Sequence, residues 1–97
     1  MMEKAKEQMR LLFSILGQQM EQQSYDDESF RKLSEISKLL EENVEISEEN
    51  RMLFDSITHY GEDALDIRDL DRRKQFINGH RDELEDFYSR LRKQLET

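Results

Sequence analysis

The sequence predicts an all-α fold, an antiparallel bundle of three or four helices with a coiled-coil-like C-terminal helix. Three observations predict it. The 97 residues contain no proline and only three glycines, and these two residue types are the ones that most often interrupt helices. Apolar residues recur at spacings of three and four, the period of one helix face. An alternating run of β-branched residues, which would indicate a strand, is missing from the sequence.

The size and composition indicate one small domain, residues 1–97, with a thin core. A chain of this length lies near the lower limit at which a single core suffices. Hydrophobic residues make up 35% and charged residues 39%, so much of the surface is solvated and some apolar surface is expected to lie against a second chain. Disordered proteins are also rich in charge, but they do not show periodic apolar residues.

The first predicted helix spans residues 2–22. Its apolar stripe consists of Met2, Ala5, Met9, Leu12 and Leu16, at helical spacing. Leu11, Phe13, Ile15 and Met20 widen the stripe, so this helix should contact more than one neighbour. Gly17 lies inside the pattern and indicates either a close helix crossing or a tolerated glycine near a fraying end.

The second predicted helix spans residues 27–45. Ser24 and Asp26 are both candidate N-caps. The apolar positions that follow keep helical spacing; they are Phe30, Leu33, Ile36, Leu40 and Val44.

The third predicted helix spans residues 48–60. Ser47 suits an N-cap followed by two acids in the first turn, although a continuous helix through Ser47 fits the pattern equally well. Gly61 follows the last periodic residue, Tyr60, and a glycine in that position commonly ends a helix.

The last predicted helix spans residues 66–95. Leu70, Ile77, Leu84 and Leu91 recur at intervals of seven, as in a coiled-coil seam. Asn78-Gly79 is a candidate turn, but the seven-residue phase continues through it and favours one long helix. The predicted core comprises Met9, Leu12, Leu16, Phe30, Leu33, Leu40, Phe54, Ile57, Leu70, Ile77, Leu84, Phe87 and Leu91.

Motifs that carry catalytic or metal chemistry are weak in this sequence. The absence of cysteine excludes disulfides, thiolate metal sites and a cysteine nucleophile. Phosphate-binding glycine loops and the Gly-x-Ser-x-Gly motif do not occur. His59 has Asp63 and Asp66 at helical spacing, and His80 precedes Glu83, but neither set has a second cluster to complete a coordination shell. We therefore expect no catalytic residue, no metal and no cofactor.

Charge is concentrated in the middle of the chain. Of the net charge of −8, residues 24–50 contribute nine acids and three bases. The negative electrostatic potential of this segment disfavours direct nucleic-acid binding. Its densest part is a candidate surface for a basic partner, although a solvated helix face is the commoner explanation; it comprises Glu41, Glu42, Glu45, Glu48 and Glu49. Arg72-Arg73-Lys74 is a basic cluster that would contact phosphate or an acidic partner, or pair with nearby acids such as Asp69.

These features predict a non-catalytic protein–protein interaction module, such as an adaptor, a chaperone-like protein or a regulator, that binds through amphipathic helix faces. Self-association as a dimer is expected through the N-terminal apolar residues Leu11, Leu12, Ile15 and Leu16, unless that helix is central in a compact monomer. The alternative is an acidic inhibitor that mimics nucleic acid or blocks a basic site on a partner. The N-terminal residues do not resemble a signal peptide and no apolar stretch approaches about 20 residues, so a cytoplasmic protein without membrane contact is expected.

Overall fold

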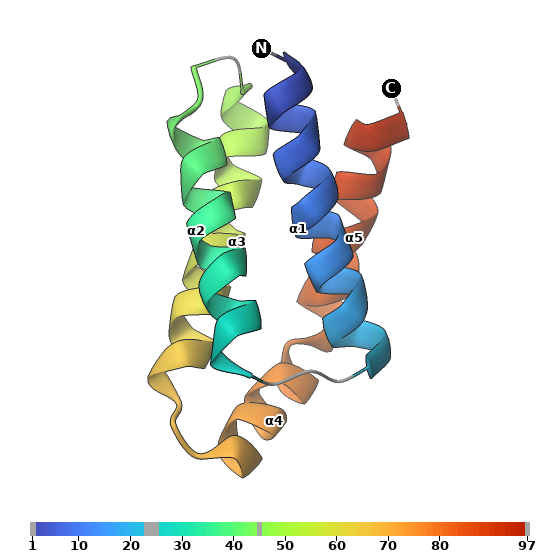
Figure 1. The fold of residues 1–97 in the computed structure, drawn as a ribbon. Helices are drawn as coiled ribbons and strands as arrows, with labels where there is room; N and C mark the ends of the chain where they lie inside the picture. The colour runs from blue at the N-terminus through green and yellow to red at the C-terminus, as the bar shows by residue number, and fades with distance from the viewer. Residues whose placement is uncertain (1, 23–25, 45, 97) are drawn as a thin grey trace.

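The computed structural model describes residues 2–22, 26–44 and 46–96. These residues form five helices and no strand (Figure 1); the helices are α1 (Met2–Gln22), α2 (Asp27–Glu42), α3 (Glu48–Asp66), α4 (Leu70–Gly79) and α5 (Arg81–Glu96). The prediction of an all-α fold is confirmed for this part of the chain.

The four longer helices lie side by side, and neighbours run in opposite directions (Figure 1). α1 packs against α5, and α2 packs extensively against α3. The short helix α4 crosses one end of this arrangement, whereas both termini and the connection between α2 and α3 lie at the other end. The molecule measures 39 × 22 × 19 Å.

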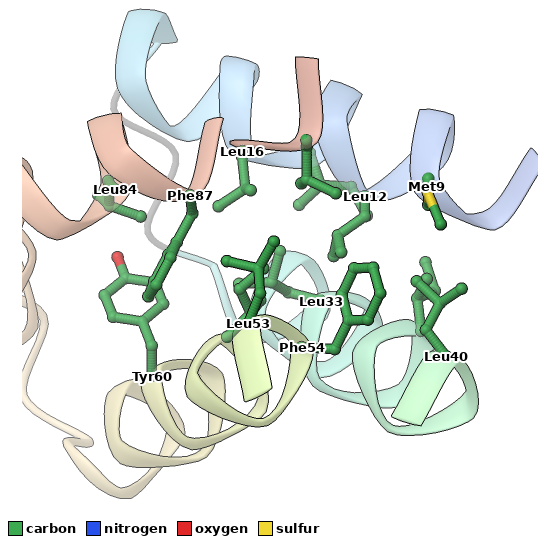
Figure 2. Packing of buried hydrophobic residues seen from close by; sticks show 14 of the residues in the cluster. Met9, Leu12, Leu16, Leu33, Leu40, Leu53, Phe54, Tyr60, Leu84 and Phe87 are labelled. Atoms are coloured by element: carbon green, nitrogen blue, oxygen red, sulfur yellow. The ribbon is translucent and has the colours of Figure 1, made fainter. Parts of the chain in front are cut away.

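The core lies between the α1–α5 pair and the α2–α3 pair (Figure 2). Except for Leu70, every residue of the predicted core is buried. Seven further apolar residues that the predicted core did not include are also buried, namely Ala5, Ile15, Ile36, Ile46, Leu53, Tyr60 and Ala64. α1 contacts both α5 and α2, which explains why its apolar stripe is wider than one neighbouring helix would require.

α2 begins at a cap and ends earlier than predicted. The Asp26 carboxylate accepts hydrogen bonds from the Ser29 backbone N–H (3.4 Å) and hydroxyl (2.9 Å), so Asp26 is an N-cap, whereas Ser24 lies outside the described residues. Asn43 is extended, so the predicted end at residue 45 is wrong. Val44 consequently leaves the apolar stripe and is 90% exposed.

α3 is a separate helix that passes through Gly61. The Ser47 hydroxyl accepts from the Asn50 N–H at 3.3 Å, so the break near Ser47 is present. The predicted end at Tyr60 is wrong, because α3 continues to Asp66. A Cβ at Gly61 would lie 3.2 Å from both the Phe30 carbonyl oxygen and the Ser34 Cβ, so this glycine permits α3 to approach α2 closely.

Alanine substitutions at Gly61 and Gly79 should change stability in opposite directions. Both positions are helical, and alanine gains about 1 kcal/mol of helix propensity over glycine. At Gly79 nothing lies within 4 Å of an added Cβ, so Gly79→Ala should stabilise the protein by about 0.5–1 kcal/mol. At Gly61 the contact is with backbone that cannot move alone, and overpacking of about 1–3 kcal/mol should make Gly61→Ala destabilising. Urea unfolding of both variants measures this, and a stabilised Gly61→Ala variant would contradict the close helix contact.

The prediction of one long helix over residues 66–95 is wrong. Asp69 caps α4 by accepting from the Asp71 N–H at 2.9 Å. α4 ends at Gly79 and is capped by His80. The His80 backbone N–H donates to the Phe76 and Ile77 carbonyls, both at 3.1 Å, and α5 begins at the next residue. Ile77 on α4 and Leu84 on α5 nevertheless reach the same core, because the sevenfold apolar series is divided between two helices.

The aromatic ring of Tyr88 explains the glycine in α1. A Cβ at Gly17 would lie 3.3 Å from the Tyr88 ring. The same ring stacks on Phe13 with a centroid separation of 4.1 Å. Gly17 therefore marks a close crossing of α1 and α5.

Candidate functional site

Most of the apolar residues predicted to bind a partner belong to the core. Leu12 and Leu16 are fully buried and Ile15 is almost so. Leu11 remains 52% exposed. The wide stripe of α1 is thus covered mainly within the chain, and Leu11 is the member of this set that is available to another molecule.

Leu11 lies on a grooved surface between α1 and α2, which we call the α1–α2 seam. One hollow of about 290 Å³ is lined by Leu11 and Ile15 of α1 and by Lys32 of α2. A second hollow of about 240 Å³ is lined by Leu39 and Glu42 of α2, together with Lys4 and Gln8 of α1. Leu39 is 53% exposed. In the sequence Leu39 lies next to the apolar stripe of α2 and not on it. An apolar residue in such a position is expected to be exposed.

The acidic residues predicted as a partner surface do not all behave alike. Glu42, Glu48 and Glu49 are exposed, and together with Val44 they form what we call the hairpin tip. The ion pairs found among the described residues involve none of these three glutamates. Glu45 lies outside the described residues.

Glu41 is half-buried and faces α3. The Thr58 hydroxyl donates to its carboxylate at 3.0 Å. Burial raises the pKa of Glu41, and a hydrogen bond with the Asp55 carboxyl raises it further. Glu41 is therefore engaged within the chain and is less available to a partner than its exposed neighbours are.

The connection between α2 and α3, next to the hairpin tip, is stabilised by Arg51 and Ile46. Arg51 donates to the carbonyl oxygens of Asn43 (3.4 Å) and Ile46 (3.2 Å). The side chain of Ile46 is buried in the core. These contacts hold the connection between α2 and α3 in place. Glu42 lines the hollow beside Leu39, whereas Glu49 lines a different hollow, with Arg90 and Lys93 of α5.

The basic cluster is divided by burial. Arg72 and Lys74 are exposed, whereas Arg73 is buried. The Arg73 Nε donates to the carbonyl oxygens of Ala64 and Ile67, both at 2.9 Å. Its Nη1 donates to the Asp27 carboxylate at 2.6 Å. Arg73 thus ties α4 to the end of α3 and the start of α2, and does not contribute to a basic surface.

Residues of both histidine–acid sets line one hollow of about 260 Å³, which we call the histidine hollow. From α3, its lining includes His59 and Asp63. From the α4–α5 junction and α5, it includes His80 and Glu83. Asp66, which shares helical spacing with His59 in the sequence, does not line it. Among the described residues, no three His, Asp or Glu side chains are arranged to hold a metal ion.

Both histidines of this hollow are oriented by backbone carbonyls. His59 Nδ1 lies 2.8 Å from the Asp55 carbonyl oxygen and 3.4 Å from the Asp55 carboxylate. His80 Nδ1 lies 2.8 Å from the Phe76 carbonyl oxygen. The hydrogen bond to the Asp55 backbone raises the pKa of His59, and the Asp55 carboxylate raises it further. Sequence spacing could not show that the two rings face one hollow, because they belong to different helices.

None of the helices in the described part of the chain combines the length and the apolar character needed to cross a bilayer. Comparisons with protein-family models, with curated proteins and with solved structures find no match to this chain. The function proposed below therefore rests on the geometry and chemistry of these surfaces.

Proposed function

We propose that the protein is a non-catalytic protein-binding module that receives an amphipathic helix of another protein on the α1–α2 seam. An adaptor, a chaperone-like protein or a regulator can work in this way. The observation that carries the proposal is the pair of half-exposed leucines, Leu11 and Leu39, each beside a hollow between the same two helices. Exposed apolar groups gathered along a groove usually mark an interaction site, and an apolar helix face in a groove is a common recognition mode.

The charge next to the seam indicates what the partner helix carries. Glu42 lines the hollow beside Leu39, at the end of α2. A partner with an apolar face and a basic end matches this distribution, because opposite charge favours one orientation of docking and speeds the encounter. The two leucines would supply most of the affinity, and Glu42 would supply the direction.

A second candidate function is favoured by the three exposed glutamates of the hairpin tip. In this alternative the protein is an acidic inhibitor that presents carboxylates in place of phosphates, or blocks a basic site on a partner. Binding of that kind depends on charge and is screened by salt, whereas apolar helix docking is not.

Two sets of exposed substitutions separate the two functions. One variant combines Leu11→Glu and Leu39→Glu, and the other replaces Glu42, Glu48 and Glu49 by glutamine. Leu70→Glu is the matched control, because Leu70 is 63% exposed and lies outside the seam. A partner is captured from host extract on the parent protein, identified, and purified for affinity measurements at low and high salt.

If the partner helix docks on the seam, we expect the double leucine variant to weaken binding by about tenfold or more, as for interface anchors. The affinity should change little in Leu70→Glu, and the affinity of the parent protein should change little at high salt. If instead the glutamine variant and high salt both weaken binding, and the leucine variant binds like the parent, the result would support the acidic inhibitor. Binding that neither variant weakens would show that the seam is not the interface.

The same leucine variant tests the predicted self-association. Ile15 is unsuitable for this purpose because it is buried and a charge there would disturb the core. If light scattering gives a dimer mass for the parent and a monomer mass for the Leu11→Glu, Leu39→Glu variant, the occupant of the seam is a second copy of the chain.

A further inference from the structure

We infer that the histidine hollow, formed where α3, the α4–α5 junction and α5 meet, is a binding site for a guanidinium group. The group would belong to a small guanidinium compound or to an arginine side chain of a protein, since both present the same donors. This site is separate from the α1–α2 seam and does not depend on the function proposed for that surface.

The polar atoms of the hollow call for hydrogen-bond donors on the ligand. A carbonyl oxygen can only accept, so Nδ1 of His59 and Nδ1 of His80 carry the hydrogen in their bonds to the Asp55 and Phe76 carbonyls. Nε2 of each neutral ring is then an acceptor. The Ser56 hydroxyl donates its one hydrogen to the Met52 carbonyl at 3.1 Å, which leaves its lone pairs as acceptors.

Carboxylates complete this set of acceptors. Asp55 and Asp63 of α3 and Glu83 of α5 line the same hollow, and ionised carboxylates accept without donating. An anionic ligand would be repelled, and a neutral ligand would leave the negative charge of the carboxylates uncompensated. A cation with several N–H groups matches them, because bonds between such donors and carboxylates are roughly twice as strong as neutral ones.

A guanidinium group fits better than a metal ion. The acceptors come from three parts of the fold, and no three of the described His, Asp and Glu side chains converge as metal ligands must. Guanidinium spreads five N–H donors over a plane and can serve dispersed acceptors. The ring of Phe76 is half-buried and packs against the His80 ring, with 4.2 Å between the ring centroids. It also lines the hollow and offers an apolar wall for the methylene stem of an arginine.

The size of the hollow agrees with a single side chain. Its volume of about 260 Å³ is below the range of about 300–1,000 Å³ that drug-sized ligands occupy. We therefore expect recognition of one guanidinium group with its short stem, and not of a larger ligand.

Binding should depend on pH through His59. The titratable groups around this ring are Asp55, Glu62 and Asp63 on its own helix, Glu41 on α2, and His80 and Glu83 across the hollow. The hydrogen bond to the Asp55 backbone, followed by the charges of Asp55, Glu62 and Asp63, places the pKa of His59 above its ordinary value of 6.5. Protonation turns Nε2 into a donor and adds a positive charge, so affinity should fall as the pH falls through this pKa, and should be full above it.

The test is an NMR titration of the full chain with N-acetyl-arginine amide, following the ring protons of Phe76, His59 and His80. N-acetyl-citrulline amide, which has nearly the same shape without the charge, is the negative control ligand. A short arginine-containing peptide and its citrulline counterpart form the second arm. Tighter binding of the peptide than of the amide would identify a protein arginine as the source, and equal binding would identify a small compound.

Matched variants test the site itself. Glu83→Gln should weaken binding about twofold to fivefold, as for an exposed ion pair, whereas Glu85→Gln, an equal charge change at an exposed position of the same helix, should not. His59→Gln should reduce the fall in affinity at low pH. The proposal is overturned if arginine amide and citrulline amide shift the rings alike or not at all, or if Glu83→Gln and Glu85→Gln behave identically. Saturation by stoichiometric zinc, with loss of both histidine signals, would replace it by a metal site.

Discussion

Replacing Arg73 by alanine should lower the free energy of unfolding by about 2–4 kcal/mol, since hydrogen bonds to a charged group contribute about 1.5–3 kcal/mol each. The guanidinium is buried, and its Nε serves the carbonyl oxygens of Ala64 and Ile67 at the end of α3. Alanine leaves the buried Ala64 carbonyl without this donor. The ion pair with Asp27 adds less, because that carboxylate is largely exposed and solvated.

Unfolding in urea, followed by circular dichroism, measures this effect. Arg72→Ala is the control, because the neighbouring side chain is exposed and its removal should change stability by less than about 0.5 kcal/mol. Arg73→Lys should fall between the parent and Arg73→Ala, since an ammonium group cannot reproduce the planar fork that reaches α2 and α3 together. Equal stability of Arg73→Ala and Arg72→Ala would show that Arg73 does not join α4 to the other helices.

Replacing Leu84 or Leu91 by alanine should destabilise the fold by about 2–5 kcal/mol each, the cost found for buried leucines when a cavity remains. Both side chains are fully buried in the core, and Leu84 lies where α5 faces α3 (Figure 2). The loss combines the transfer of apolar surface back to water with the contacts that the surrounding side chains cannot restore.

Leu70→Ala is the matched control for these two variants. Leu70 belongs to the same sevenfold series, but it begins α4 and is 63% exposed. Its replacement should change stability by less than about 0.5 kcal/mol. Thermal melting of the three variants gives the comparison, and if Leu84→Ala and Leu91→Ala melt like the parent, α5 is not packed as the structure describes.

The helices were predictable from the sequence because their signals are local. Apolar residues at three- and four-residue spacing mark the buried faces, and caps such as Asp26 and Ser47 act within their own first turn. Burial of Leu12, Leu33 and Leu84 follows from the same period.

The errors fall where a local signal has two structural uses. A glycine after an apolar series ends many helices, but at Gly61 it permits contact with Phe30 and Ser34 of another helix. The seven-residue phase continues through Gly79, but periodicity records which residues face the core and not whether one helix or two present them.

The candidate surfaces show the same division. Leu11 and Leu39 were visible as apolar residues at the margin of their stripes, yet their placement on one seam required α1 and α2 to be adjacent. His59 and His80 each had an acid at helical spacing, but they lie 21 positions apart in the sequence. The histidine hollow exists because α4 turns across the end of the bundle and returns the chain along α3.

The sequence by itself determined the all-α class, most of the buried faces and the acidic character of the middle of the chain, because period, propensity and composition are properties of neighbouring residues. The tertiary structure decided that Gly61 lies inside a helix and that the last predicted helix is interrupted at His80. It also decided that Arg73 is buried while Arg72 is exposed, and that two histidines share one hollow. Each of these depends on contacts between helices, which a pattern along one helix does not record.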